Sequence, residues 1–339
     1  MESKEPYLHH DGYYYEEVKW HTRQKHKFIE KYLEIWINSV AKKRNPPTLD
    51  IIDLFGSYGF CYCPAVMDIE GEKAFWEGSA ALATRYLKKY SRPGQLFINT
   101  YNPLDDEHNT KQCKNIHKLI RQYQLKPAPI VINQDISIAT DSAIDTIKGH
   151  FPNLWILDPY APSALPWETI ERIASRNIPY LDNSGKTRKP ELIITLMTYH
   201  LQQEINNHPE YLSEAFGVPE DEWRIFYEIA KKADINATDF IAMYFSLRLE
   251  TIYGRIPVYT RVNQTGGNQI VFHIFFCSEN DAGHYSMKQH GVKRYDEYVN
   301  SEWSEMAGKI KLKKKEEREQ KKIEKKIEKL KNEGQTFLF

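Results

Sequence analysis

Five short apolar runs, separated by longer stretches of helical or loop character, constrain this chain more than any other feature. They are residues 49–55, 95–99, 129–133, 154–158 and 192–197. Near-continuous apolar runs are typical of strands that are buried on both faces of a parallel sheet. Helical segments between the runs, such as residues 79–90 and 166–175, supply the crossovers that parallel strands need. The pattern predicts an α/β fold with a mostly parallel sheet.

The spacing of apolar residues changes twice in the C-terminal half of the chain. Residues 201–252 have mostly helical spacing, and residues 256–262 and 269–277 are strand-like. The short connection between these two strands contains Gly266-Gly267, which favours an antiparallel hairpin. Five parallel strands closed by a C-terminal hairpin are the outline of the Rossmann-like class I methyltransferase fold. We therefore expect that fold, with a helical insertion at about residues 201–252.

The two ends of the chain differ from the body. Residues 1–20 are rich in aromatic and charged side chains and indicate an extended lead-in to a domain at residues 21–300. Thr22 is expected to cap the first long helix of that domain. In the tail, residues 301–339, lysine and glutamate alternate with few apolar residues, which predicts a solvated helix with an excess of basic charge.

Composition excludes several classes of protein. No apolar run reaches the roughly 18 residues of a membrane span, and the charged N-terminus lacks a signal segment. The chain has 339 residues but 4 cysteines, too few for a disulfide framework, so a cytoplasmic location is expected. Cys61 and Cys63 lack a standard zinc spacing, and His200, His273 and His284 lack the spacing of paired ligands, so no metal site is expected.

A glycine-bearing turn follows the first predicted strand. It runs from Asp53 through Phe55 and Gly56 to Gly59. Glycine at the carboxyl end of a strand lets the backbone approach a nucleotide-like cofactor, and ligands of open α/β sheets bind at those ends. These four residues are therefore candidates for binding an adenosyl cofactor. An ordinary strand-to-helix turn explains the string equally well when it is taken alone.

Polar residues also end the next strands. Asn99 stands where an acid usually holds ribose hydroxyls, and an amide can bond a hydroxyl without charge assistance. Asp135, close behind the third strand, could accept a hydrogen bond from an adenine amino group. Thr22 and Lys25, in the first turns of the early helix, could reach the same crevice. Solvated strand ends and a solvated helix start are the alternatives.

The string Asp158-Pro159-Tyr160 follows the fourth predicted strand. It resembles the Asp-Pro-Pro-Tyr motif of amino-group methyltransferases, although the second proline is absent. In that motif the acidic residue and the prolyl carbonyl hold the target amine, and the aromatic ring stacks on an extruded base. The resemblance makes these three residues the catalytic candidates. An ordinary turn after a buried strand remains the alternative.

Several strings occur together and in order between about residues 19 and 290. They are Trp20-His21-Thr22 with Lys25-His26, Asp53-Leu54-Phe55 with Gly56 and Gly59, Leu157-Asp158-Pro159-Tyr160 with Pro166-Trp167-Glu168-Thr169, and Phe272 to Ser278. Together they resemble the three-Cys-motif partner (TcmP) family of bacteria and archaea. The resemblance implies a methyltransferase-like domain, S-adenosylmethionine as cofactor, and a radical-SAM-like protein with a three-cysteine motif as partner.

Two functions follow as hypotheses. The first is S-adenosylmethionine-dependent methyl transfer to nucleic acid, with the Lys-rich tail contacting phosphates. The second is a non-catalytic adaptor in DNA repair, modification or defence, which is favoured by Asn99 and by Tyr58, a bulky residue in the cofactor turn. The terminal string from Gln335 to Phe339 matches peptides that dock on the bacterial sliding clamp, with a frayed apolar end as the alternative.

Overall fold

The computed structural model describes residues 5–41, 48–101, 106–147, 152–176, 178–179, 187–264, 269–292 and 304–332. Its main feature is a seven-stranded sheet with the order β12-β13-β11-β8-β3-β6-β7. Its strands are β3 (Leu49–Asp53), β6 (Pro93–Asn99), β7 (Ile130–Ile132), β8 (Asn153–Leu157), β11 (Glu191–Leu196), β12 (Val258–Asn263) and β13 (Ile270–Cys277). The first five are parallel to one another, and β13 runs antiparallel between β11 and β12. The predicted α/β fold with a largely parallel sheet is confirmed, and it is consistent with a Rossmann-like fold.

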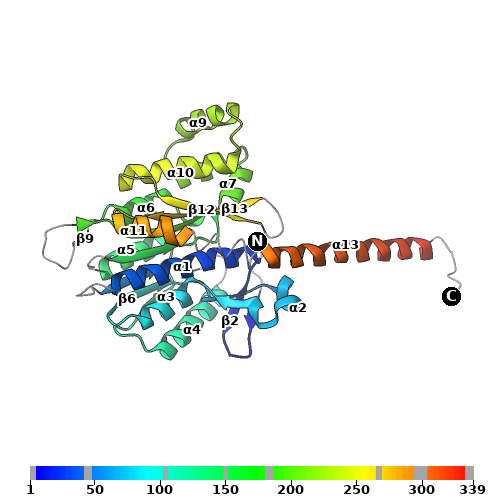
Figure 1. The fold of residues 1–339 in the computed structure, drawn as a ribbon, viewed down its shortest axis with the longest axis horizontal. Helices are drawn as coiled ribbons and strands as arrows, with labels where there is room; N and C mark the ends of the chain where they lie inside the picture. The colour runs from blue at the N-terminus through cyan, green and yellow to red at the C-terminus, as the bar shows by residue number, and fades with distance from the viewer. Residues whose placement is uncertain are drawn as a thin grey trace.

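Helices cover both faces of this sheet (Figure 1). One face carries α1 (His21–Ala41), α3 (Ser79–Lys89) and α4 (Asp106–Tyr123), and the other carries α5 (Ile136–Thr146) and α6 (Trp167–Ala174). Successive strand residues point to opposite faces. Ile51 and Ile98 accordingly belong to the first core, whereas Ile52 and Phe97 belong to the second. Burial on both faces explains why these strands lack polar alternation.

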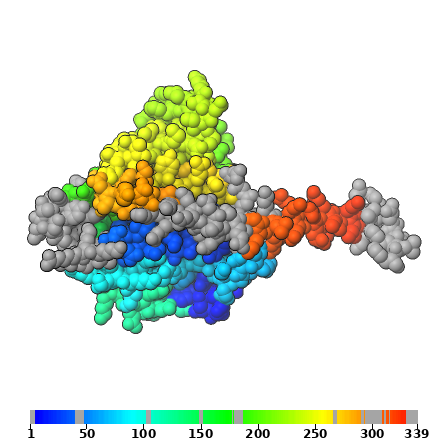
Figure 2. All heavy atoms as spheres, viewed as in Figure 1, coloured from blue at the N-terminus to red at the C-terminus, as the bar shows by residue number. Residues whose placement is uncertain are grey.

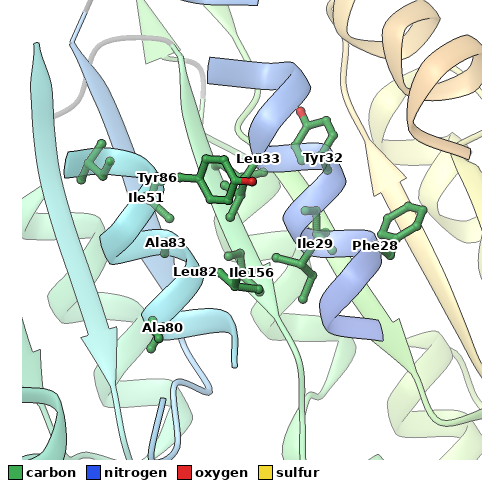
Figure 3. Packing of buried hydrophobic residues seen from close by; sticks show 14 of the residues in the cluster. Phe28, Ile29, Tyr32, Leu33, Ile51, Ala80, Leu82, Ala83, Tyr86 and Ile156 are labelled. Atoms are coloured by element: carbon green, nitrogen blue, oxygen red, sulfur yellow. The ribbon is translucent and has the colours of Figure 1, made fainter. Parts of the chain in front are cut away.

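Helix α1 packs beside α3 on the first face (Figure 3). Its buried side chains are Phe28, Ile29, Tyr32 and Leu33, which recur at helical spacing and meet Leu82, Ala83 and Tyr86 of α3 above Ile51 and Ile156 of the sheet. The helix begins at His21, and the N–H of Thr22 donates to the carbonyl of Lys19 (3.0 Å). The prediction that Thr22 caps the helix is therefore wrong, because Thr22 lies inside the first turn.

A second, four-stranded sheet was not predicted from the sequence. Its order is β1-β2-β4-β5, formed by β1 (Tyr7–Leu8), β2 (Tyr14–Glu17), β4 (Phe60–Tyr62) and β5 (Phe75–Glu77). Strand β2 pairs in parallel with β4. Between β4 and β5 lie the short helices η1 (Pro64–Val66), α2 (Met67–Glu70) and η2 (Gly71–Ala74). Part of the expected lead-in is therefore built into the body of the protein.

The expected helical insertion and closing hairpin are both present. Four helices connect β11 to β12, namely α7 (Thr198–Glu204), α8 (Pro209–Phe216), α9 (Glu220–Lys232) and α10 (Ala237–Tyr253). A two-stranded ribbon of β9 (Ile178–Pro179) and β10 (Thr187–Arg188) precedes β11. After β13, α11 (Asp281–Ser286) leads into a π-helix, η4 (Met287–Gly291), whose Met287 is fully buried in the core that α1 helps to form.

The tail forms one long helix, α13 (Ser304–Asn332), that projects from the body (Figures 1 and 2). Lys313 bonds Asp68 (2.7 Å), and Lys309 lies 3.7 Å from Glu70, so the start of α13 is held against α2. The predicted solvated helix is present, whereas the string from Gln335 to Phe339 lies outside the described residues. Among the described residues, every helix is too short or too polar to cross a lipid bilayer.

Candidate functional site

A cavity of about 230 Å³ opens at the carboxyl ends of β3 and β8. Strand β3 pairs with β6 on one side and with β8 on the other, so the chain reverses its direction of winding between β3 and β8. Ligands of open α/β sheets bind at this switch point. Phe55 and Gly56 leave β3 there, and Asp158 leaves β8. The sheet topology thus places the two predicted strings on one cavity.

The cavity brings together eight of the eleven predicted site residues. They are Thr22, Lys25, Phe55, Gly56, Gly59, Asp158, Pro159 and Tyr160. The first two come from α1, the next three from the turn after β3, and the last three from the turn after β8.

Lys25 and Asp158 form a buried ion pair on the cavity wall. Lys25 Nζ lies 2.7 Å from Asp158 Oδ2, and His26 Nε2 lies 3.8 Å from the same oxygen. Burial opposes ionisation of Asp158, but the Lys25 ammonium and His26 outweigh it and lower the pKa of Asp158 to about 2. Asp158 is therefore a carboxylate at neutral pH.

His26 is a neutral donor in this cluster. Burial lowers its pKa, and the nearby Lys25 ammonium lowers it further, although Asp158 acts in the opposite direction. The indole N–H of Trp76 donates to His26 Nδ1 (2.9 Å). Because Nδ1 accepts this bond, the ring proton is on Nε2, which faces Asp158. His26 therefore cannot act as a proton acceptor while Trp76 holds it.

One oxygen of Asp158 is left without a partner in the described part of the chain. Its Oδ1 is buried and has no hydrogen-bond partner among the described residues. Pro159 beside it is buried, whereas the ring of Tyr160 is 47 % exposed on the cavity wall. Phe55 meets that ring edge-on, with centroids 6.4 Å apart. The site therefore offers an acceptor for an N–H group next to an open aromatic face.

The glycine turn is shaped by packing as well as by the cavity. The N–H of Gly56 donates to the carbonyl of Asn99 (2.9 Å), and a Cβ on Gly56 would lie 2.5 Å from a methyl group of Ile98. Gly59 has φ +74°, which favours glycine. Tyr58 is 2 % exposed and packs against His108 of α4 instead of lining the cavity. The bulky side chain of Tyr58 therefore lies outside the cavity lining.

The structure does not bring Asp53, Asn99 and Asp135 to the cavity wall. Asn99 donates to the carbonyls of Leu54 (3.3 Å) and Gln134 (3.0 Å), and its oxygen accepts from the N–H of Gln134 (3.1 Å). Both ends of the amide therefore hold the loops together, and the side chain is 2 % exposed. The expected ribose contact would require these bonds to break.

Asp135 and Asp53 have structural partners of their own. Asp135 is the N-cap of α5 and accepts from the N–H of Ser137 (3.0 Å). Asp53 is fully buried and accepts from the N–H of Phe55 (3.1 Å). Burial raises the pKa of Asp53 to about 7, although the hydroxyl of Ser79 and the N–H of Phe55 act against this rise.

Glu16 is the main cavity residue that sequence reasoning missed. It comes from β2 of the second sheet, and the hydroxyl of Ser57 donates to its Oε2 (2.8 Å). Burial raises the pKa of Glu16, partly offset by the Ser57 bond and the Lys25 charge. No motif or period in the N-terminal segment marks this residue, because its place depends on a strand pairing between distant segments.

Comparison with known proteins finds no family model and no curated protein that matches this sequence.

Proposed function

We propose that this chain is a methyltransferase-like protein of the three-Cys-motif partner kind, which transfers a methyl group from S-adenosylmethionine to an amino group of nucleic acid. The observation that carries the proposal is the ionised Asp158, with a buried free oxygen beside the open ring of Tyr160. The sheet supports it, because five parallel strands and a closing hairpin are the outline of class I methyltransferases.

In this proposal the turn after β8 holds the methyl acceptor. Asp158 Oδ1 accepts an N–H of the target amine, the carbonyl of Pro159 offers a second acceptor, and Tyr160 stacks on the extruded base. A carboxylate with a pKa of about 2 orients the amine but is a poor base. Glu16, whose pKa is raised, is a better proton acceptor on the same wall.

Several groups on the cavity wall suit S-adenosylmethionine. Lys25 suits a carboxylate, and Phe55 offers an apolar face. Gly56 and Gly59 leave the turn without side chains, and Thr22 adds a hydroxyl. When bound, the cofactor supplies a methyl group on a positively charged sulfur.

The projecting helix supports a nucleic-acid substrate. Exposed basic residues recur on one face of α13, within about 80° of one another on a 3.6-residue helix: Lys315, Arg318, Lys322 and Lys325. Lys309 and Lys313, which hold α13 to α2, lie on the opposite side of the helix. The basic face is therefore turned away from α2 and is suited to phosphates.

Tyr160→Ala tests the proposal with little risk to folding, because nearly half of the side chain is exposed. Base–aromatic stacking is worth about 1–3 kcal/mol, so kcat/KM for methyl transfer to DNA or RNA should fall about 10- to 100-fold. Binding of S-adenosylmethionine, measured by calorimetry, should stay within a few-fold. Tyr285→Ala of α11, which removes another exposed tyrosine, should behave like wild type. The proposal fails if the wild-type protein binds neither the cofactor nor its product at high micromolar concentration.

The adaptor function is the second candidate. The observation that favours it is Asn99, whose amide is committed to backbone groups instead of to a ribose site. In that case the radical-SAM-like partner, or a sliding clamp bound through Gln335 to Phe339, is the functional ligand. Co-purification of such a partner by a protein that binds no cofactor would support this second candidate.

A further inference from the structure

Three potential metal ligands converge away from the cavity, in the second sheet. They are His9 and His10, which follow β1, and Glu72 of η2. One ligand atom from each residue lies within 4.8 Å of the others. His9 Nε2 is 3.5 Å from Glu72 Oε2, and the two imidazole rings have centroids 3.9 Å apart.

His9 is held rigidly in this position. Its side chain is 7 % exposed and packs against Phe75 and Tyr15. Its backbone closes a turn with Tyr13 and Gly12, at 3.0 Å and 2.9 Å. A ligand whose orientation is fixed before binding loses less entropy when it binds.

Asp11 lies on the other side of the His9 ring. Asp11 Oδ2 lies 3.3 Å from His9 Nδ1 and accepts from the hydroxyl of Tyr15 (2.9 Å), while Oδ1 accepts from the N–H of Tyr13 (2.8 Å). Metal-binding histidines commonly have a carboxylate near their second nitrogen. The other ring nitrogen of His9, Nε2, faces the Glu72 carboxylate.

The spacing of the ligand atoms suits a metal ion. Nε2 of His9 and Oε2 of Glu72 are 3.5 Å apart, and a ligand atom of His10 lies within 4.8 Å of the ligand atoms of both residues. Zinc bonds of about 2.1 Å place tetrahedral ligands about 3.4 Å apart, which is close to the separation of His9 and Glu72.

We propose that His9, His10 and Glu72 bind a zinc-type transition-metal ion, with the Asp11 carboxylate beside the second ring nitrogen of His9. Two imidazoles and one carboxylate suit Zn²⁺ and exclude Mg²⁺, which prefers oxygen ligands. The ion would join the turn after β1 to η2, two segments that are far apart in the sequence. It would thereby stabilise the sheet whose strand β2 carries Glu16 to the cavity. The site does not depend on the proposed methyl transfer.

Calorimetry on the full-length protein with Zn²⁺ tests the site. Wild-type protein should bind one Zn²⁺, and His10→Ala and Glu72→Gln should each weaken binding at least ten-fold. Both side chains are exposed, so neither change threatens folding. His117→Ala on α4 removes another exposed histidine and should leave binding unchanged. Co²⁺ should give the visible spectrum of a tetrahedral complex with the wild type and lose it with His10→Ala.

Two results would overturn the proposal. One is the absence of saturable Zn²⁺ binding by the wild-type protein. The other is equal Zn²⁺ affinity in the wild type, His10→Ala and Glu72→Gln, which would place the ion elsewhere. Mg²⁺ in place of Zn²⁺ should give no heat, and comparable heat would also contradict an imidazole site.

Discussion

The carboxyl ends of β6, β7 and β8 lie along one edge of the same sheet. The polar side chain at the end of β8 has a different role from those at the ends of β6 and β7. After β8, Asp158 faces the cavity, where Lys25 holds one oxygen and the other is free. After β6 and β7, Asn99 holds three backbone groups and Asp135 caps α5. Between them, Asp53 of β3 is buried, and burial raises its pKa to about 7, although the Lys25 charge acts against this rise.

The difference shows that a polar residue at a strand end becomes a ligand only when its neighbours leave an atom available. A buried carboxylate is stable only beside a cation, and Asp158 has Lys25 for this purpose. Asn99 meets loop carbonyls instead, and they take both of its N–H groups. The environments also separate two carboxyl groups by about five pKa units, from about 2 for Asp158 to about 7 for Asp53.

Breaking the Lys25–Asp158 pair should have the largest effect on stability. Lys25→Met leaves the Asp158 carboxylate buried without its cation, which should lower the free energy of unfolding by about 3–5 kcal/mol. Urea unfolding at pH 7 measures this change. The double variant Lys25→Met/Asp158→Asn should recover much of the loss, because no uncompensated charge remains. A single variant as stable as wild type would mean that Lys25 is not what stabilises the Asp158 charge.

Asp53 should produce the next largest effect, visible as pH dependence. Its folded-state pKa of about 7 is above the usual 3.8, so the folded protein binds more protons than the unfolded chain between these values. Wild-type stability should therefore fall as the pH rises from about 4 to 7, by at most about 4 kcal/mol from this group. Asp53→Asn should remove that part of the slope in unfolding measured across this range. The exposed Asp221→Asn of α9 should keep the wild-type slope, and an unchanged slope in Asp53→Asn would contradict the burial effect.

Asn99→Asp tests whether the β6 end is structural or a ribose site. The change removes two donors and sets a carboxylate against the carbonyls of Leu54 and Gln134, so stability at pH 7 should fall by about 1–3 kcal/mol. Asn280→Asp, at the N-cap of α11, should cost little because both side chains cap helices well. Tighter S-adenosylmethionine binding by Asn99→Asp without loss of stability would assign the position to the cofactor instead.

Asp135→Ala should have the smallest effect. Loss of the α5 cap should lower the free energy of unfolding by about 1 kcal/mol in urea unfolding. Cofactor affinity measured by calorimetry should not change, because Asp135 does not line the cavity. A ten-fold loss of affinity would show that the β7 end contributes to the site as the β8 end does.

The sequence by itself determined the elements of the main sheet. Apolar runs, helical periods and the Gly-Gly connection predicted five parallel strands, the helical insertion and the closing hairpin, because these signals are local and repeat along the chain. The position of Asp158-Pro159-Tyr160 after β8 followed from the same reasoning. For α9, the spacing of apolar residues predicted a helix, but Ile225 and Ile229 of that helix are exposed. The spacing alone does not determine whether another element covers the apolar face of a helix.

Only the tertiary structure decided which side chains form the site. The pairing of Lys25 with Asp158 and the contribution of Glu16 both join segments that are distant in the sequence. The second sheet has strands of two to four residues, too short to carry a clear period, and its β2–β4 pairing is parallel and non-local. The residue type at a strand end determines which hydrogen bonds and charges its side chain can offer. The neighbouring residues in the folded protein determine whether that side chain faces a cavity or bonds to the backbone.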